Sequence, residues 1–200
     1  AIMAGGEQAL TRSVEGAEDD MDAARRDLEA HGLSARDAVV AIAASGRTPY
    51  ALGALAYART LGALTIALSC NAPAPLLDAA EIAIAVVTGP EGITGSTRMK
   101  AGTAQKLILN MISTGSMIKL GKVYGNWMVD VQATNAKLRQ RARRFVTQLG
   151  GVDDERAGEL LAAAHDDVKT AGVIGGRGVD ANAARALLAA ADGFLRRVID

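Results

Sequence analysis

A short polar segment that follows an apolar run is the strongest candidate for a ligand site. It consists of Ser45, Gly46, Arg47 and Thr48, and it lies between the apolar residues 38–44 and Pro49. Backbone N–H groups and hydroxyls at such a strand-to-helix turn can converge on an anion, because a helix N-terminus favours negative charge. Alternatively, Ser45 or Thr48 only caps the helix. Open α/β sheets bind ligands at the carboxyl ends of their strands, which favours a phosphate site.

A second polar segment, residues 91–103, combines hydroxyls, cations and glycines around another predicted helix start. Its candidate ligands are Glu91, Ser96, Thr97 and Lys100. Glu91 is either an ordinary loop carboxylate or an acceptor for sugar hydroxyls. The hydroxyls and the basic residues equally suit an N-cap followed by a solvated first turn. The number of donors exceeds what capping needs, which favours a contribution to binding.

Two glutamates near the N-terminus are candidates for proton transfer. Glu15 and Glu18 are three residues apart in a pattern typical of a helix over residues 7–30, so they would share a face. A carboxylate near a substrate carbon acid can act as a general base. The alternative is an ordinary solvated charged face. Gly16 indicates either a helix boundary or a place where something approaches the backbone closely.

The order of predicted elements favours an α/β fold with a parallel sheet flanked by helices. Apolar runs predict strands at 38–44, 63–69 and 82–87, and residues 49–61 predict the crossover helix between the first two. A long, apolar helix buried on more than one side is expected at 97–120. We place a boundary at Gly150 and Gly151, giving a domain at 1–149 and a small all-helical domain at 150–200, with helices over 154–171 and 180–199.

Composition narrows the class of partner. The 22 basic residues balance the 22 acidic ones, so no overall charge favours nucleic acid, and a small-molecule partner is expected. Cys70 is the only cysteine, which excludes an internal disulfide, and no Cys/His cluster has the spacing of a metal site. No membrane span or signal peptide is evident. These features predict a soluble, cytoplasmic protein.

Four motifs in order resemble the N-acetylmuramic acid 6-phosphate etherase family. They are Glu-Gly-Ala-Glu-Asp at 15–19, Ile-Ala-Ala-Ser-Gly-Arg-Thr-Pro-Tyr at 42–50, Thr-Gly-Ser-Thr-Arg-Met-Lys-Ala-Gly-Thr-Ala-Gln-Lys at 94–106, and Gly-Lys-Val-Tyr-Gly-Asn at 121–126. The resemblance implies a sugar isomerase (SIS) fold followed by a small helical domain. It also implies a homodimer, since SIS proteins usually pair, with the helix beginning near Thr97 as a candidate interface.

The resemblance implies a carbon–oxygen lyase that removes D-lactate from N-acetylmuramic acid 6-phosphate with water. The product is N-acetylglucosamine 6-phosphate, formed during the recycling of bacterial cell-wall sugars (peptidoglycan). A base takes the C2 proton, an acid protonates the departing ether oxygen, and water adds back. No metal or organic cofactor is implied.

The resemblance also suggests roles for individual residues. The second glutamate of the first motif, which is active in the family, falls on Glu18. Ser45 and Thr48 lie in a segment similar to the one that contacts phosphate in the family. Ser96, Thr97 and Lys100 lie in the second signature, where substrate contacts are expected.

The chain departs from the family pattern at its beginning. Family members have, upstream of the position of Ala4, a strand with a Gly-Thr-Ser-Gly-Arg loop and a Ser-Glu-Cys-Pro segment whose glutamate acts as the acid. Residues 1–200 contain neither, so we expect an N-terminally truncated copy with weak or no activity by itself. Two alternatives stay open: a non-catalytic sugar-phosphate regulator similar to the glucokinase regulatory protein, and an aldose–ketose isomerase.

Overall fold

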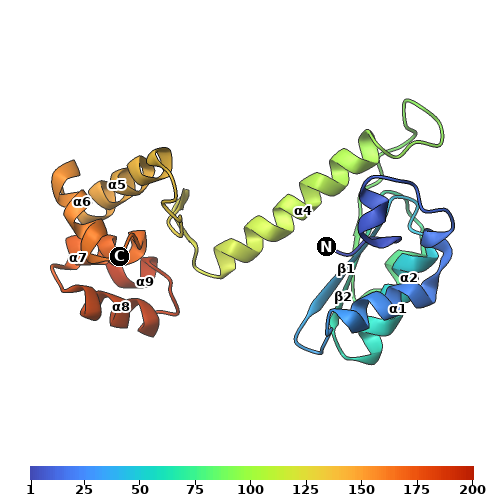
Figure 1. The fold of residues 1–200 in the computed structure, drawn as a ribbon, viewed down its shortest axis with the longest axis horizontal. Helices are drawn as coiled ribbons and strands as arrows, with labels where there is room; N and C mark the ends of the chain where they lie inside the picture. Colours follow the sequence, from blue (N-terminus) through green and yellow to red (C-terminus); the bar gives the residue numbers. More distant parts are fainter. The chain divides into compact units, whose positions relative to one another are not determined.

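A computed structural model describes residues 1–200, which form two compact units. The first comprises Ala1–Asn110 and the second Met111–Asp200. The boundary falls within helix α4 (Lys100–Lys119), and Figure 1 shows the elements of both units. No helix is both long and apolar enough to cross a membrane.

The first unit is built on a three-stranded parallel sheet. Strands β1 (Ala38–Ala43), β2 (Leu64–Ser69) and β3 (Ile82–Ala85) lie in the order β1-β2-β3, with Ala43 paired with Ser69 and Ser69 with Ala85. The three apolar runs in the sequence thus coincide with the strands to within two residues. The predicted α/β class, a parallel sheet flanked by helices, is confirmed.

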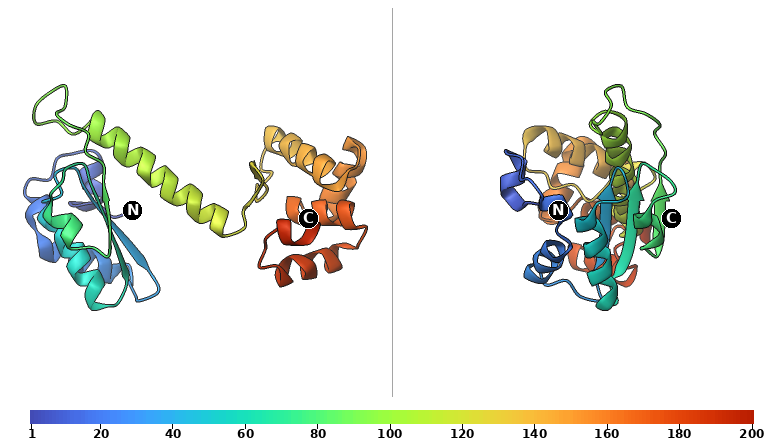
Figure 2. Two further views of the ribbon diagram at one scale, coloured as in Figure 1. Left: turned by 180° about the vertical axis from the view of Figure 1, so that it is seen from behind. Right: turned by 90° about the vertical axis from the view of Figure 1, so that its right-hand side faces the viewer.

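Helices α2 (Pro49–Thr60) and α3 (Pro75–Asp78) pack on one face of this sheet. Their core is formed by fully or nearly fully buried apolar side chains, namely Leu55 and Leu76 from the helices and Ala41, Ala43 and Ala67 from the strands. Figures 1 and 2 show α1 and α2 on the same side of β1 and β2. This packing fixes the direction in which the chain leaves β1 and enters α2.

The opposite face of the sheet keeps much of its apolar surface accessible. Because side chains alternate along a strand, Ile42, Leu64 and Ile82 lie on the face away from α2. They expose 38%, 39% and 45% of their surface, respectively. Parallel sheets are usually covered on both faces, so this surface is unusual for the fold class.

The N-terminal segment is not one helix, which corrects the prediction of a helix over residues 7–30. It forms short 3-10 helices η1 (Gly6–Leu10) and η2 (Ala17–Asp19), followed by helix α1 (Met21–Ala30). Gly16 has a positive φ of 73°, which breaks the helix, and Asp20 caps α1 by accepting a hydrogen bond from the Ala23 N–H at 2.9 Å. Of the two interpretations of Gly16, the helix boundary is therefore confirmed.

Helices α1 and α2 approach each other very closely. Gly53 of α2 faces the first turn of α1, where a Cβ on residue 53 would clash with the carbonyl oxygen of Met21 and lie 2.9 Å from its Cα. Around this contact, Ala24 and Leu28 of α1 pack on Ala54 of α2. Small side chains thus let the two helix backbones lie almost directly on each other.

Helix α4 is as long as the sequence predicts, but it is not buried. Ala101 is its one buried residue, whereas apolar side chains along the rest of the helix are exposed: Leu107, Leu109, Met111, Met117 and Ile118. The expectation of burial on more than one side is wrong. It rested on the apolar composition alone, which does not determine what packs against a helix.

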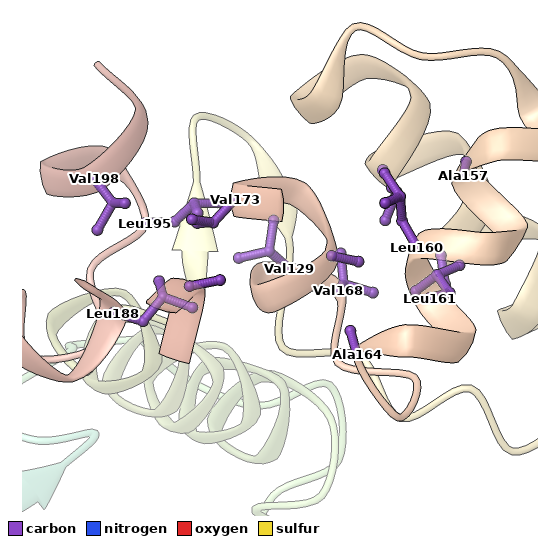
Figure 3. Packing of buried hydrophobic residues seen from close by; sticks show 14 of the residues in the cluster. Val129, Ala157, Leu160, Leu161, Ala164, Val168, Val173, Leu188, Leu195 and Val198 are labelled. Atoms are coloured by element: carbon purple, nitrogen blue, oxygen red, sulfur yellow. The ribbon is translucent and has the colours of Figure 1, made fainter. Parts of the chain in front are cut away.

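After the C-terminal part of α4, the second unit contains the β4–β5 hairpin (Val123–Tyr124 and Trp127–Met128) and five helices. These are α5 (Ala136–Gly150), α6 (Asp154–Ala163), α7 (Val168–Arg177), α8 (Ala181–Ala190) and α9 (Arg196–Ile199). Figure 3 shows their shared core, in which Leu160, Val173 and Leu195 are buried. The two helices expected at 154–171 and 180–199 are each divided in two, because Asp167 caps a new helix and the chain turns at Asp192 and Gly193.

Gly150 and Gly151, where the sequence predicts a domain boundary, lie at the end of helix α5. Gly151 has a φ of 63° and ends α5 as its C-cap. Ala142 and Val146 of α5 belong to the same core as α6 to α9. The compact units divide at Asn110 and Met111 instead, so a domain division at residue 150 stays a prediction.

The contact at Gly53 can be tested by substitution. Gly53→Ala should lower the free energy of unfolding by about 1–3 kcal/mol, because the added methyl forces α1 away from α2. Gly115→Ala is the matched control, since a Cβ at Gly115 in α4 would meet no atom within 4 Å. The control should gain up to about 1 kcal/mol from helix propensity. Urea unfolding followed by far-UV circular dichroism measures both, and equal effects would argue against the close contact.

Candidate functional site

A cavity of about 820 Å³ beside β1 brings together several of the predicted site residues. Glu18 from η2, Ser45 from the loop after β1, and Thr48 at the start of α2 all line it. Thr97, from the segment before α4, lines it as well. All four lie in the first unit, although they are up to 79 residues apart in the sequence. The cavity thus has both carboxylates and hydroxyls in its lining.

The loop at 45–48 owes its shape to Gly46. Its φ is 66°, and a Cβ there would lie 2.5 Å from the Ala74 Cβ and 2.6 Å from the Ser69 Oγ. The Leu76 N–H donates a hydrogen bond to the Gly46 carbonyl at 3.0 Å, and the Gly46 N–H donates to Ala43 at 3.1 Å. A glycine is therefore required for both the backbone conformation and the space.

Residues after β2 hold the start of this loop. The Ala44 carbonyl accepts hydrogen bonds from the Cys70 N–H at 3.0 Å and from the Asn71 Nδ2 at 2.8 Å. The buried Ser69 hydroxyl donates to the Asn71 carbonyl at 2.8 Å. Sequence reasoning missed these supports. Cys70 and Asn71 directly follow the carboxyl end of β2, the strand next to β1, where such contacts are expected.

The hydroxyls of the loop are only partly used within the protein. Thr48 is the N-cap residue of α2, but its side chain makes no capping hydrogen bond. The Ser45 Oγ accepts a bond from the Arg47 N–H at 3.2 Å. Because the Thr48 hydroxyl makes no capping bond, the interpretation of Thr48 as a simple helix cap is wrong. Arg47 is exposed, and neither Gly46 nor Arg47 lines the cavity.

Glu91 binds the N-terminus of α4. Its carboxylate accepts hydrogen bonds from the Lys100 N–H at 3.0 and 3.1 Å and from the Ala101 N–H at 3.0 Å. These two backbone donors, first Lys100 and then Ala101, hold the pKa of the carboxyl below its usual value. The Lys100 ammonium donates to the Pro90 carbonyl at 2.7 Å. Glu91, Ser96 and Lys100 therefore surround the helix start and do not line the cavity.

The two N-terminal glutamates face different hollows. Glu18 lines the main cavity, whereas Glu15 lines a second hollow of about 510 Å³ together with Asp20 and Asp27. The αL conformation of Gly16 between them turns the chain, so they do not share a helix face as the spacing predicts. Only Glu18 is placed near the 45–48 loop. No group of three or more His, Cys, Asp or Glu side chains could hold a metal ion.

The first 59 residues match a known domain family. The model of the glucokinase regulatory protein N-terminal SIS domain matches residues 1–59. This stretch contains Glu18, strand β1 and the 45–48 loop. The match and the parallel sheet together confirm the predicted SIS fold.

Curated proteins are similar over almost the whole chain. An N-acetylmuramic acid 6-phosphate etherase of Cronobacter sakazakii is 56% identical over 198 residues, which are 99% of this chain and 67% of that protein. The etherase of Geobacillus thermodenitrificans is 52% identical over 200 residues, 100% of this chain and 68% of its own length. That of Streptomyces coelicolor is 55% identical over 195 residues, 98% and 63% respectively. The chain thus spans about two thirds of the length of these relatives.

The contact between Glu91 and α4 predicts a pH-dependent stability. Because the folded pKa of Glu91 lies below its ordinary value of 4.5, its contribution is present above pH 4.5 and is lost as the pH falls through the folded pKa. Glu91→Gln should therefore be less stable than the unaltered protein at pH 7, and the difference should shrink in acid. Urea unfolding at a series of pH values measures this.

The matched control is Glu7→Gln, because Glu7 in η1 makes no hydrogen bond through its side chain. Its stability should follow that of the unaltered protein at every pH. A difference between Glu91→Gln and the unaltered protein that stays constant into acid would contradict the assignment.

Proposed function

Because the chain belongs to the N-acetylmuramic acid 6-phosphate etherase family, we propose that it cleaves the lactyl ether of N-acetylmuramic acid 6-phosphate with water. The products are D-lactate and N-acetylglucosamine 6-phosphate. Family membership rests on identities of 52–56% over nearly the whole chain, which confirm the resemblance of the motifs. The observation that carries the proposal is the cavity shared by Glu18, Ser45 and Thr48.

In this proposal the 45–48 loop binds the phosphate. Ser45 and Thr48 offer hydroxyls at the N-terminus of α2, where the helix dipole favours an anion. Gly46 packs against Ala74 and Ser69 and gives the loop its shape, and the exposed Arg47 adds positive charge to the loop. Among the residues of the second signature, Thr97 contributes a hydroxyl to the same cavity. Glu91 and Lys100 act indirectly in this proposal, because their hydrogen bonds hold the segment that carries Ser96 and Thr97 against the start of α4.

Glu18 acts as the base in the proposed elimination. The aldehyde of the open-chain sugar makes the C2 proton acidic enough for a carboxylate to remove it. The ether oxygen leaves as it takes a proton from an acid, and water then adds to the unsaturated sugar. In the first stage the C2–H and C3–O bonds break, the C2=C3 double bond forms, Glu18 takes the C2 proton and the lactate oxygen receives the proton of the acid. In the second stage an O–H bond of water and the double bond are consumed, and new C3–OH and C2–H bonds form. The enzyme is therefore proposed to be a carbon–oxygen lyase.

The substrate suggests where the reaction takes place. A phosphorylated sugar carries charge that prevents passive passage through a bilayer, so we propose that the enzyme works in the cytoplasm during peptidoglycan recycling. With 22 basic and 22 acidic residues, the chain has no net positive charge that would attract nucleic acid. A small molecule is the expected partner.

A regulator that binds sugar phosphates without chemistry is the second candidate. It is favoured by one observation, the match of residues 1–59 to the glucokinase regulatory protein SIS domain. That stretch includes the 45–48 loop, so both candidates use the same phosphate site. They differ in whether Glu18 transfers a proton.

Replacement of Glu18 distinguishes the two candidates. In the full-length protein, including any residues encoded upstream of Ala1, Glu18→Gln should lower D-lactate release by about 10²–10⁴-fold, the usual contribution of a general base. Binding of N-acetylglucosamine 6-phosphate, measured by calorimetry, should persist. Glu15→Gln is the control and should keep most of its activity, because Glu15 faces the other hollow.

Two results would contradict the etherase proposal. One is a full-length protein that binds the sugar phosphate but releases no lactate, which is the behaviour of a regulator. The other is full turnover in Glu18→Gln. Residues 1–200 by themselves should release lactate slowly, since they span about two thirds of the related enzymes.

A homodimer is proposed from the exposed surface of α4. Leu107, Met111 and Ile118 are exposed and lie on one face of this helix at helical spacing. Met111→Glu should convert a dimer into a monomer in size-exclusion chromatography with light scattering, because a charge in an apolar interface is costly. Lys106→Glu, which lies off this stripe, should leave the dimer intact. An unaltered protein that is monomeric would refute the proposal.

A further inference from the structure

One side-chain hydrogen bond joins helix α1 to helix α2. The Tyr50 phenol donates to the Asp27 Oδ2 at 2.5 Å, in a partly buried position. The two residues are 23 positions apart in the sequence. No other side-chain hydrogen bond connects the two helices. This bond is therefore the one side-chain contact between them that depends on a particular distance and angle.

Each partner is rigidly connected to a different part of the candidate site. Tyr50 lies in the first turn of α2, two residues after Thr48 at the end of the 45–48 loop. Asp27 lies in α1, whose N-cap Asp20 follows Glu18 by two residues. Asp20 is itself fixed by the Ala23 N–H and by Arg26 at 3.0 Å. The bond therefore connects the loop to the glutamate through two short helices.

The rest of the contact between the two helices is apolar. Besides the close approach at Gly53, Ala24 and Leu28 of α1 pack with Ala54 of α2, and Tyr50 and Tyr57 lie against this cluster. Apolar contacts are not directional, whereas a hydrogen bond needs a particular distance and angle between its partners. The bond between Tyr50 and Asp27 therefore adds a directional restraint to helices that already pack on each other.

Tyr50 lines the main cavity but is poorly suited to proton transfer. Burial, and then the neighbouring Asp27 carboxylate, raise the pKa of the phenol, so it stays protonated at neutral pH. Its proton is engaged by Asp27, whose side chain faces the second hollow. In this structure the phenol proton is therefore used in the bond to α1.

We propose that Tyr50 and Asp27 are positioning residues that hold Glu18 at its working distance from the 45–48 loop. This inference rests on the proposed etherase function. A base displaced by about 1 Å can lose on the order of 10²-fold in rate while binding is retained, since the phosphate loop itself is unchanged. The expected signature is thus a loss in kcat with little change in KM.

Tyr50→Phe tests this in the full-length protein. We expect kcat for D-lactate release to fall by about 10–100-fold, with KM within about threefold of the unaltered value. With substrate deuterated at C2, the kinetic isotope effect should increase, because proton removal becomes slower than the other steps. A change in packing alone would not act selectively on the C2 proton.

Tyr57→Phe is the matched control. Tyr57 lies on the same helix and packs against the same apolar cluster, but its hydroxyl makes no hydrogen bond in the structure. It should retain the kcat and the isotope effect of the unaltered protein. Equal losses of kcat in the two variants would overturn the inference.

Substitution of Asp27 tests the same bond from its other partner. Asp27→Asn keeps an oxygen acceptor for the phenol and should retain most of kcat, whereas Asp27→Ala should resemble Tyr50→Phe. The double variant Tyr50→Phe/Asp27→Ala should be no slower than either single variant, because both remove the same bond. Additive losses would overturn the inference, and so would full activity of Asp27→Ala.

The outcomes separate this inference from the function on which it rests. If the unaltered protein releases no lactate, the proposed function fails and the inference fails with it. If the unaltered protein is active and Tyr50→Phe matches Tyr57→Phe, only the inference fails. Thermal unfolding of each variant shows whether Tyr50→Phe is folded, and the Asp27→Asn and Asp27→Ala pair decides the question if it is not.

Discussion

The close approach of two helices at Gly53 is the constraint on which the sheet-containing unit depends. A glycine inside a helix costs about 1 kcal/mol relative to alanine, and α2 tolerates this cost because the backbone of Met21 occupies the space. The contact lies at the first turn of α1, directly after the turn that carries Glu18. Glu18 lines the same cavity as Ser45 and Thr48, which lie directly before the first turn of α2.

The parts of this structure that depend on local sequence could be predicted. Short apolar runs gave the three strands to within two residues, and Pro49 marked the first turn of α2. The 45–48 loop could be identified because a strand end and a helix start are both visible in the sequence. Asp20, Asp153, Asp167 and Asp180 each cap a helix, and attention to such aspartates would have corrected the helix boundaries.

The remaining features depend on contacts between residues that are far apart. Glu91 faces backbone donors nine and ten residues later, so its role as a capping carboxylate is not apparent from its neighbours. Tyr50 and Asp27 meet only because α1 folds against α2. Apolar composition also misled for α4, since the same residues suit a buried helix and an exposed one. Spacing alone likewise placed Glu15 beside Glu18, which the turn at Gly16 prevents.

The hydrogen bonds between the Glu91 carboxylate and the Lys100 and Ala101 N–H groups hold the two ends of residues 91–101 together, so this segment forms a closed ring. The entropy of closing such a ring grows only logarithmically, by about 0.6 kcal/mol for each doubling of its length. The ring contains Thr97, which lines the main cavity, so the closure at Glu91 also restricts where this hydroxyl can lie.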